Sequence, residues 1–273
     1  MGLIKNAVRA TMGGLGYDLV PRTAPTVRFE TFSNLARAYE QMLNDAEPLI
    51  PADEMRPKLL ARLRGTPPTE AYAIVQGLWR SRDVAGDVCE FGVAQGETSA
   101  LIANEIVRMA NGKTLHLFDS FEGLPKPTEK DELKDDIFGL GSMEAYTGTM
   151  SCGEDMVRAR LAAISFPEER HVIHKGFVEP VLAAGGPDLP RQVSFAYLDF
   201  DFYEPIKVTL EYLHDIMPRG AVVVVDDYDF FSTGAKTAVD EFVEARNQDG
   251  RVYDCVVPPP ERYGHFAVLT RVG

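Results

Sequence analysis

From Gly86 onward, short apolar runs alternate with segments whose apolar residues recur at helical spacing. This alternation restricts the possible folds most strongly, because it favours a parallel sheet with helices packed on both faces. Seven runs have the length and composition of strands: Asp87–Val93, Thr114–Asp119, His171–Lys175, Ser194–Asp199, Gly220–Asp226, Tyr253–Val257 and Phe266–Arg271. Helices are expected over Glu97–Ala110, Glu154–Ile164, Val178–Ala184, Lys207–Met217 and Ala235–Arg246.

The last two predicted strands are separated only by Pro258–His265. That connection is too short for a helical crossover, so the final strand is expected to run antiparallel to its neighbours. Five parallel strands, a sixth and an antiparallel seventh resemble the methyltransferase variant of the Rossmann fold. We therefore expect an α/β fold of the class I S-adenosylmethionine-dependent methyltransferase type, with a seven-stranded sheet.

The region before the sheet reads as helical. Apolar residues recur at helical spacing from Val27 to Leu49, and a second helix is expected over Met55–Leu63. Thr69 follows a Pro-Pro turn, is expected to cap a third helix, and is counted among the cofactor-binding candidates. We expect two parts, an N-terminal helical lid or oligomerisation region (1–85) and a methyltransferase domain (86–273).

Composition excludes several classes of protein. With 28 basic and 41 acidic side chains the net charge is −13, which argues against nucleic-acid binding. Three cysteines make neither a disulfide framework nor a zinc knuckle, so a reducing, cytoplasmic compartment is expected. No apolar stretch has the length of a membrane span, although peripheral contact through the N-terminus stays open.

A polar, charged segment, Lys126–Glu144, interrupts the alternation of strands and helices. Long insertions of this kind are either solvated loops or lids over a binding site. The sequence leaves both interpretations open.

A glycine turn joins the first predicted strand to the next helix. Gly92 and Gly96 are spaced GxxxG, without the middle glycine of the dinucleotide fingerprint GxGxxG, so a pyrophosphate cofactor fits poorly. S-adenosylmethionine has no phosphates and needs only a backbone turn and nearby polar groups, and Glu90 could face its ammonium group. A tight turn in an unrelated α/β fold is the competing interpretation.

A second acid strengthens the cofactor interpretation. Asp119 ends the second predicted strand, where a carboxylate can accept both ribose hydroxyls of an adenosine cofactor. The competing interpretation is a helix or turn cap, because Asp and Ser often start turns.

Acidic residues gather at the ends of two later strands. Asp199 and Asp201 follow the fourth strand, and Asp226, Asp227 and Asp229 follow the fifth. Carboxylates this close repel one another, and a hard divalent cation such as Mg²⁺, which takes oxygen ligands, relieves the repulsion. Helix capping and solvation are the competing interpretation, most plausibly for Asp229.

Four motifs occur in a specific order: EFGVAQGET, LFDSFEGLP, LDFDFYEP, and VVVDDYDFF followed by GAKTAVDEF. In this combination the chain resembles the macrocin O-methyltransferase family, S-adenosylmethionine- and Mg²⁺-dependent enzymes that methylate sugar hydroxyls. The resemblance covers about residues 60 to 250. It implies a cofactor site that includes Glu90, Gly92, Gly96 and Thr98 near the methionine part, Asp119 and Ser120 at the ribose, and Gly176 and Phe177 near the adenine.

The resemblance also implies the chemistry. Asp199, Asp226 and Asp227 would hold Mg²⁺, and Asp199 or Asp201 would act as the catalytic base. The expected reaction transfers a methyl group to a hydroxyl of a sugar or glycoside, in a homodimer or larger homo-oligomer. Two alternatives stay open: methylation of a catechol-like phenol, and a non-catalytic subunit that binds S-adenosylmethionine as a scaffold.

Overall fold

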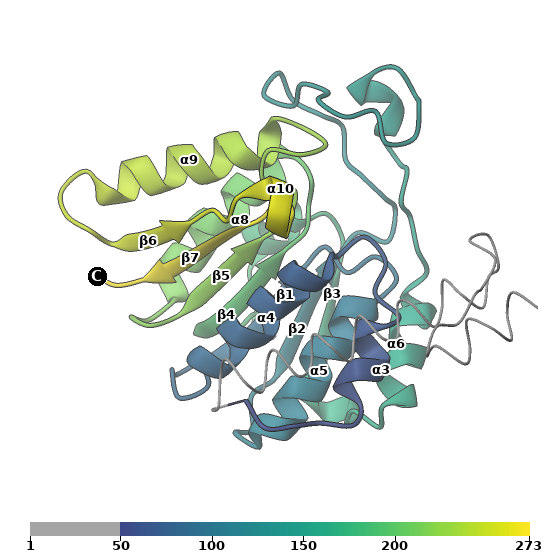
Figure 1. Cartoon of the computed structure of the whole chain (residues 1–273), viewed down its shortest axis with the longest axis vertical. Coiled ribbons are helices and arrows are strands. Elements are labelled where there is room, and N and C mark those ends of the chain that lie inside the picture. The colour runs from purple at the N-terminus through teal and green to yellow at the C-terminus, as the bar shows by residue number, and fades with distance from the viewer. Residues whose placement is uncertain (1–49) are drawn as a thin grey trace, which may run out of the picture.

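One seven-stranded sheet forms the centre of the molecule, in the order β3-β2-β1-β4-β5-β7-β6 (Figure 1). The computed structural model describes residues 50–273, so the helix predicted between Val27 and Leu49 lies outside the described part of the chain. The strands are β1 (Asp87–Phe91), β2 (Leu115–Asp119), β3 (His171–Lys175), β4 (Val193–Leu198), β5 (Val222–Val225), β6 (Tyr253–Val256) and β7 (Ala267–Arg271). All seven predicted strands are present, each within two residues of its predicted ends.

The predicted antiparallel final strand is confirmed. β7 is inserted between β5 and β6 and runs antiparallel to both, whereas β1 to β5 pair in parallel. The connection before β7 holds one short helix, α10 (Pro260–Tyr263), which the sequence did not predict. This order and orientation define the class I S-adenosylmethionine-dependent methyltransferase fold, as the strand pattern predicted.

Helices cover both faces of the sheet (Figure 1). One face packs against α4 (Pro68–Arg80), α5 (Glu97–Met109) and α6 (Glu154–Ala163), and the other against α7 (Val178–Ala184), α8 (Tyr203–Ile216) and α9 (Gly234–Asn247). Helix α8 begins four residues earlier than predicted, because Pro205 falls in its first turn, where the missing amide hydrogen is tolerated.

The period of two along each strand decides which side chains face α4. Tyr197 of β4 and Val224 of β5 pack in the core between the sheet and α4–α6, whereas Leu198 and Val225 pack in the opposite core. Continuing this alternation past the strand ends directs Asp199 and Asp226 towards the α4 side.

The described part of the N-terminal region packs on the sheet domain. The short helix α3 (Arg56–Leu60) contributes Arg56, a fully buried guanidinium whose Nε lies 2.7 Å from Oε1 of Glu105. Trp79 Nε1 donates to the same carboxylate at 2.8 Å. The predicted boundary at residue 85 therefore separates segments that share a buried ion pair.

The predicted capping role of Thr69 is wrong. Helix α4 begins at Pro68 with Pro67 as its N-cap, so Thr69 lies inside the first turn. Its hydroxyl donates instead to the carbonyl of Tyr263 in α10. Proline at the first helical position explains the shift, because its fixed φ suits that position.

Candidate active site

A cavity of about 560 Å³ opens at the carboxyl ends of β1, β2, β4 and β5. In open α/β sheets, ligands bind in the crevice at this edge. The cavity is lined by residues from the glycine turn, the two acidic strand ends, and the long segment after β2. Of the predicted site residues, Gly92, Asp119, Ser120, Gly176, Phe177, Asp199, Asp201, Asp226 and Asp227 line it.

The glycine turn after β1 brings the backbone close to β4. Gly92 has φ +83°, and a Cβ atom there would lie 1.8 Å from the carbonyl oxygen of Asp199. Only glycine fits this position, for both conformational and steric reasons. The turn therefore places its backbone directly beside the backbone of Asp199, the first residue of the acidic cluster.

Asp119 tethers the glycine turn. Its Oδ2 accepts the amides of Val93 and Ala94 at 2.7 and 2.9 Å, and its Oδ1 accepts the amide of Phe121 at 2.6 Å. Gly176 is held at the same place, because its amide donates to the Asp119 carbonyl at 2.9 Å. The predicted ribose acid and the predicted adenine segment thus lie together at one end of the cavity.

Four predicted cofactor residues do not line the cavity: Thr69, Glu90, Gly96 and Thr98. Gly96 is the left-handed N-cap of α5, and the Thr98 hydroxyl lies 3.1 Å from that of Thr66. Glu90 is fully enclosed, and burial raises its pKa to about 8, while the Ser99 hydroxyl opposes that rise. Their roles in cofactor binding stay predictions.

The acidic cluster forms as the strand register predicts. β4 and β5 pair with Leu198 opposite Val225, so Asp199 and Asp226 leave the sheet side by side. Carboxylate oxygens of Asp199, Asp201 and Asp227 lie within 4.8 Å of one another. Asp201 and Asp227 both have φ near +60°, a left-handed conformation that is uncommon outside glycine and concentrates at functional sites.

Asp226 belongs to the cluster, but its carboxylate is not among the three that group most closely. Oδ1 accepts the amide of Asp227 at 2.7 Å, and Oδ2 accepts the hydroxyl of Tyr197 at 3.0 Å. The oxygens brought together in the structure are thus those of Asp199, Asp201 and Asp227, whereas the sequence grouped Asp199, Asp226 and Asp227 as metal ligands.

Burial raises the pKa of every carboxyl in the cluster, and repulsion between neighbouring acids raises those of Asp199 and Asp227 further. Glu70 of α4 adds another carboxyl, fully buried against Asp226, and burial raises its pKa as well. Neither Glu70 oxygen forms a well-aligned hydrogen bond within the described residues. A partly buried, oxygen-only donor set with excess negative charge fits a hard divalent cation such as Mg²⁺.

Sequence reasoning missed Glu70, Tyr197 and Thr66. Glu70 and Thr66 belong to no recognisable motif and reach the site because helix α4 and its preceding turn pack across the end of the sheet, whereas Tyr197 belongs to β4 and directly precedes the LDFDFYEP motif. A buried glutamate in the first turn of an amphipathic helix was the available signal. The apolar wall of the cavity, which includes Ile137, Phe138 and Met150, was also missed.

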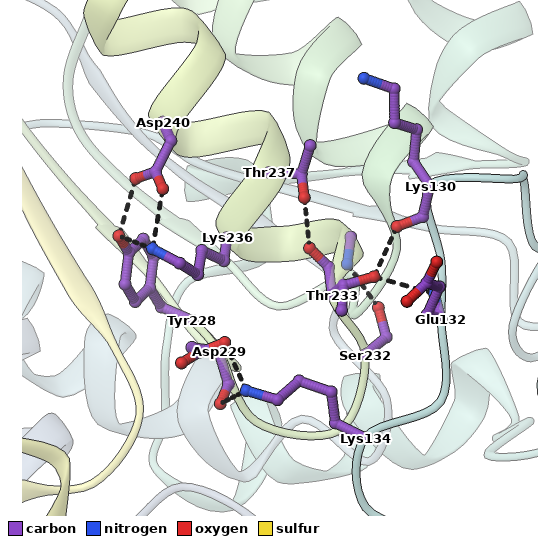
Figure 2. A network of polar contacts seen from close by, with 11 residues as sticks. Lys130, Glu132, Lys134, Tyr228, Asp229, Ser232, Thr233, Lys236, Thr237 and Asp240 are labelled. Atoms are coloured by element: carbon purple, nitrogen blue, oxygen red, sulfur yellow. Dashed lines mark hydrogen bonds and ion pairs between the residues drawn. The ribbon is translucent and has the colours of Figure 1, made fainter.

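The polar segment after β2 is bonded to the start of α9 and to the turn after β5. Thr233, at the start of α9, donates to the Lys130 carbonyl at 2.7 Å and accepts the Glu132 amide at 2.9 Å (Figure 2). Lys134 forms an ion pair with Asp229 in the turn after β5 (Figure 2). This segment therefore covers part of the cavity while bonded to the turn that carries Asp226 and Asp227.

Asp229 is solvated at the surface, as the competing interpretation of the acidic residues expected. It lies at the surface beside Lys134 and does not line the cavity. The other four aspartates at these two strand ends do.

The sheet order and a cavity at the strand ends beside a glycine turn define the class: this is a class I S-adenosylmethionine-dependent methyltransferase fold. The family model described as Macrocin-O-methyltransferase (TylF) matches residues 73–254. The chain belongs to that family and is an S-adenosylmethionine-dependent O-methyltransferase. A comparison with curated proteins found no match.

Solved structures agree with the fold. The O-methyltransferase NovP is 20% identical, with a TM-score of 0.62, covering 89% of this chain and all of that one. The calicheamicin methyltransferase CalS11 is 22% identical, with a TM-score of 0.61, covering 92% and 94% of the two chains. An O-methyltransferase from Bacillus cereus in complex with SAH is 14% identical, with a TM-score of 0.53, covering 90% of this chain and all of that one.

Within residues 50–273, none of the helices combines the length and the apolar character that a membrane crossing requires.

Proposed function

We propose that this enzyme transfers the methyl group of S-adenosylmethionine to a hydroxyl of a sugar or glycoside, with Mg²⁺ held at the acidic cluster. The observation that carries the proposal is the convergence of Asp199, Asp201 and Asp227 within 4.8 Å at the cavity edge. The structurally similar CalS11 is described as a TDP-rhamnose 3′-O-methyltransferase, which supports a sugar acceptor.

The two halves of the cavity would have separate tasks. The glycine turn, Asp119 and Gly176 would hold the cofactor at one end, and the acidic cluster would hold the acceptor at the other. Because Gly92 touches the Asp199 carbonyl, the methyl donor and the acceptor hydroxyl would be held close together, which lowers the entropic barrier to in-line transfer.

A sugar hydroxyl is a poor nucleophile because its pKa lies far above neutral. Bound Mg²⁺ would lower that pKa and orient the reacting oxygen. Asp199 or Asp201 would then accept the proton. Burial raises the pKa of Asp201, which makes its carboxylate a stronger base than an exposed aspartate.

A catechol-like phenol is the second candidate acceptor, because aromatic side chains flank the acidic cluster. Phe200 lies between Asp199 and Asp201, and Phe230 follows the second acidic strand end; both line the cavity. Such rings could hold a flat phenol. A metal held by Asp199, Asp201 and Asp227 would supply the same acidifying chemistry to a catechol as to a sugar diol.

The test is a mass-spectrometric acceptor screen with S-adenosylmethionine and Mg²⁺. The panel holds glycosides with adjacent free hydroxyls, the matching glycosides that lack one of the pair, and a catechol. Gain of one methyl group by the diol glycosides is the expected result. Asp227→Asn should lose most turnover, whereas Asp229→Asn, a surface aspartate two residues away, should keep it.

Methylation of the catechol alone would overturn the sugar proposal in favour of the phenol. Equal turnover of the diol and single-hydroxyl glycosides would remove the need for a bidentate acceptor on a metal. Cofactor binding with no methylation of any acceptor in the panel would favour the scaffold alternative.

A further inference from the structure

We propose that Tyr197 is a positioning residue for the metal site: its hydroxyl fixes the directions in which the carboxylates of Asp199 and Asp226 point. The inference rests on the proposed metal role of the acidic cluster and extends it to a residue that touches neither acceptor nor cofactor. It makes Tyr197 a determinant of metal affinity.

Three carboxyl groups from three different elements converge on this one hydroxyl. The Tyr197 hydroxyl lies 3.0 Å from Asp226 Oδ2, at the end of β5, and 3.4 Å from Asp199 Oδ2, at the end of its own strand. Glu70, from α4, lies beside the same hydroxyl, although neither of its oxygens is well aligned for a hydrogen bond. A hydroxyl has one proton to donate, so it links these acids rather than neutralising them.

The position of the hydroxyl is itself fixed. The tyrosine ring is fully buried in the core between the sheet and α4–α6, so the side chain has no room to swing away. Behind it, the Thr66 side chain lies beside the Tyr197 hydroxyl, and the Thr66 hydroxyl is in turn 3.1 Å from that of Thr98. Thr98 belongs to the first turn of α5, directly after the glycine turn.

This arrangement performs the task that outer hydrogen-bond partners perform in other metal sites. Groups that orient metal-binding side chains typically change metal affinity about 10- to 100-fold when they are removed. A phenylalanine would fill the same space in the core but would leave the two aspartates without their shared donor. The expected effect is therefore on metal binding, with little effect on the fold.

The experiment is a calorimetric titration of Mg²⁺ into metal-free, full-length protein. We expect Tyr197→Phe to weaken Mg²⁺ binding about 10- to 100-fold, while the affinity for S-adenosylmethionine stays within about twofold. Tyr253→Phe is the matched control, since Tyr253 is also buried and its hydroxyl is also hydrogen-bonded, to His214 at 3.1 Å, but at the far edge of the sheet. That variant should bind Mg²⁺ as the wild type does.

Thr66→Val is the second variant, and it keeps the test decisive should Tyr197→Phe fail to fold. It removes the polar group that lies beside the Tyr197 hydroxyl and leaves a methyl group there, so it should also weaken Mg²⁺ binding, by less than Tyr197→Phe. Wild-type Mg²⁺ affinity in both variants, or in Thr66→Val alone where Tyr197→Phe does not fold, would overturn the inference. Failure of the wild type itself to bind Mg²⁺ would instead refute the proposed metal role, and this inference with it.

Discussion

Cofactor binding should remove a proton from Glu90. This carboxyl is fully enclosed, and burial raises its pKa to about 8. It is proposed to face the ammonium group of S-adenosylmethionine, which would stabilise its charged form. The perturbation is therefore the arrival of a positive charge at a carboxyl that is protonated in the free enzyme.

The size of the effect follows from that pKa. With a pKa of about 8, roughly nine in ten Glu90 side chains hold a proton at pH 7. If the bound cofactor restores an ordinary glutamate pKa near 4.3, about 0.9 proton should leave per binding event. Between pH 5.5 and 7 the affinity should rise about tenfold per pH unit, because close to one proton leaves Glu90 for each cofactor molecule bound.

Calorimetry in two buffers of different ionisation enthalpy measures the released proton directly. Glu90→Gln, which cannot ionise, should bind with no Glu90-linked release and with a nearly flat pH profile. A cofactor fragment, 5′-methylthioadenosine, lacks the ammonium group and should release no proton from the wild type. Buffer-independent heats for the wild type, or an unchanged release in Glu90→Gln, would refute the reasoning.

Three further predictions concern stability and the covering segment. In metal-free protein the cluster carboxyls, Asp199 among them, have raised pKa values, so they contribute stability fully below their unfolded pKa near 4. That stability is lost as the pH rises through the pKa values of the folded state. Tm should therefore fall from pH 5 to 8, and Mg²⁺ should restore most of the loss. Gly92→Ala should lower the free energy of unfolding, measured in urea, by at least about 2 kcal/mol, because the new Cβ atom meets backbone. Gly112→Ala is the control, with φ +75° and open space around it, and should lower it by about 1 kcal/mol or less. Equal losses would show that backbone strain alone matters. Asp131→Ala should expose the segment at 126–150 to proteolysis, because the buried Asp131 carboxylate accepts an amide at the start of α8 and two hydrogen bonds from residue 128. Asp135→Ala, at an exposed aspartate of the same segment, should leave the cleavage rate unchanged. Identical cleavage rates in the two variants would contradict this.

The positions of the strands and the meeting of the acidic residues follow from local signals, whereas the arrangement of the sheet was expected from the resemblance to the methyltransferase variant of the Rossmann fold. Apolar runs located each strand, and the short stretch before Phe266 indicated that the final strand runs antiparallel. Parallel pairing of the fourth and fifth strands was enough to bring Asp199 beside Asp226, because the carboxyl ends of parallel strands meet at one edge of the sheet.

The direction of side chains around the site could not be predicted, because it depends on contacts between elements far apart in sequence. Asp226 turns towards Tyr197 because helix α4 closes that side of the site and brings Glu70 with it. Asp131 belongs to a charged run that the sequence left open between a solvated loop and a lid, and its carboxylate is buried and bonded to the first residue of α8, Tyr203. Neither contact has a sequence pattern of its own.

The central claim is that methyl transfer depends on a metal held by the acidic cluster. The most direct measurement is the initial rate of methyl transfer to a diol glycoside by chelator-treated enzyme, before and after Mg²⁺ is added back, in wild type and Asp227→Asn. The account predicts that treated wild type loses nearly all activity and recovers it with Mg²⁺, and that the variant does not recover. Full activity of the treated wild type, with no response to added Mg²⁺, would contradict it.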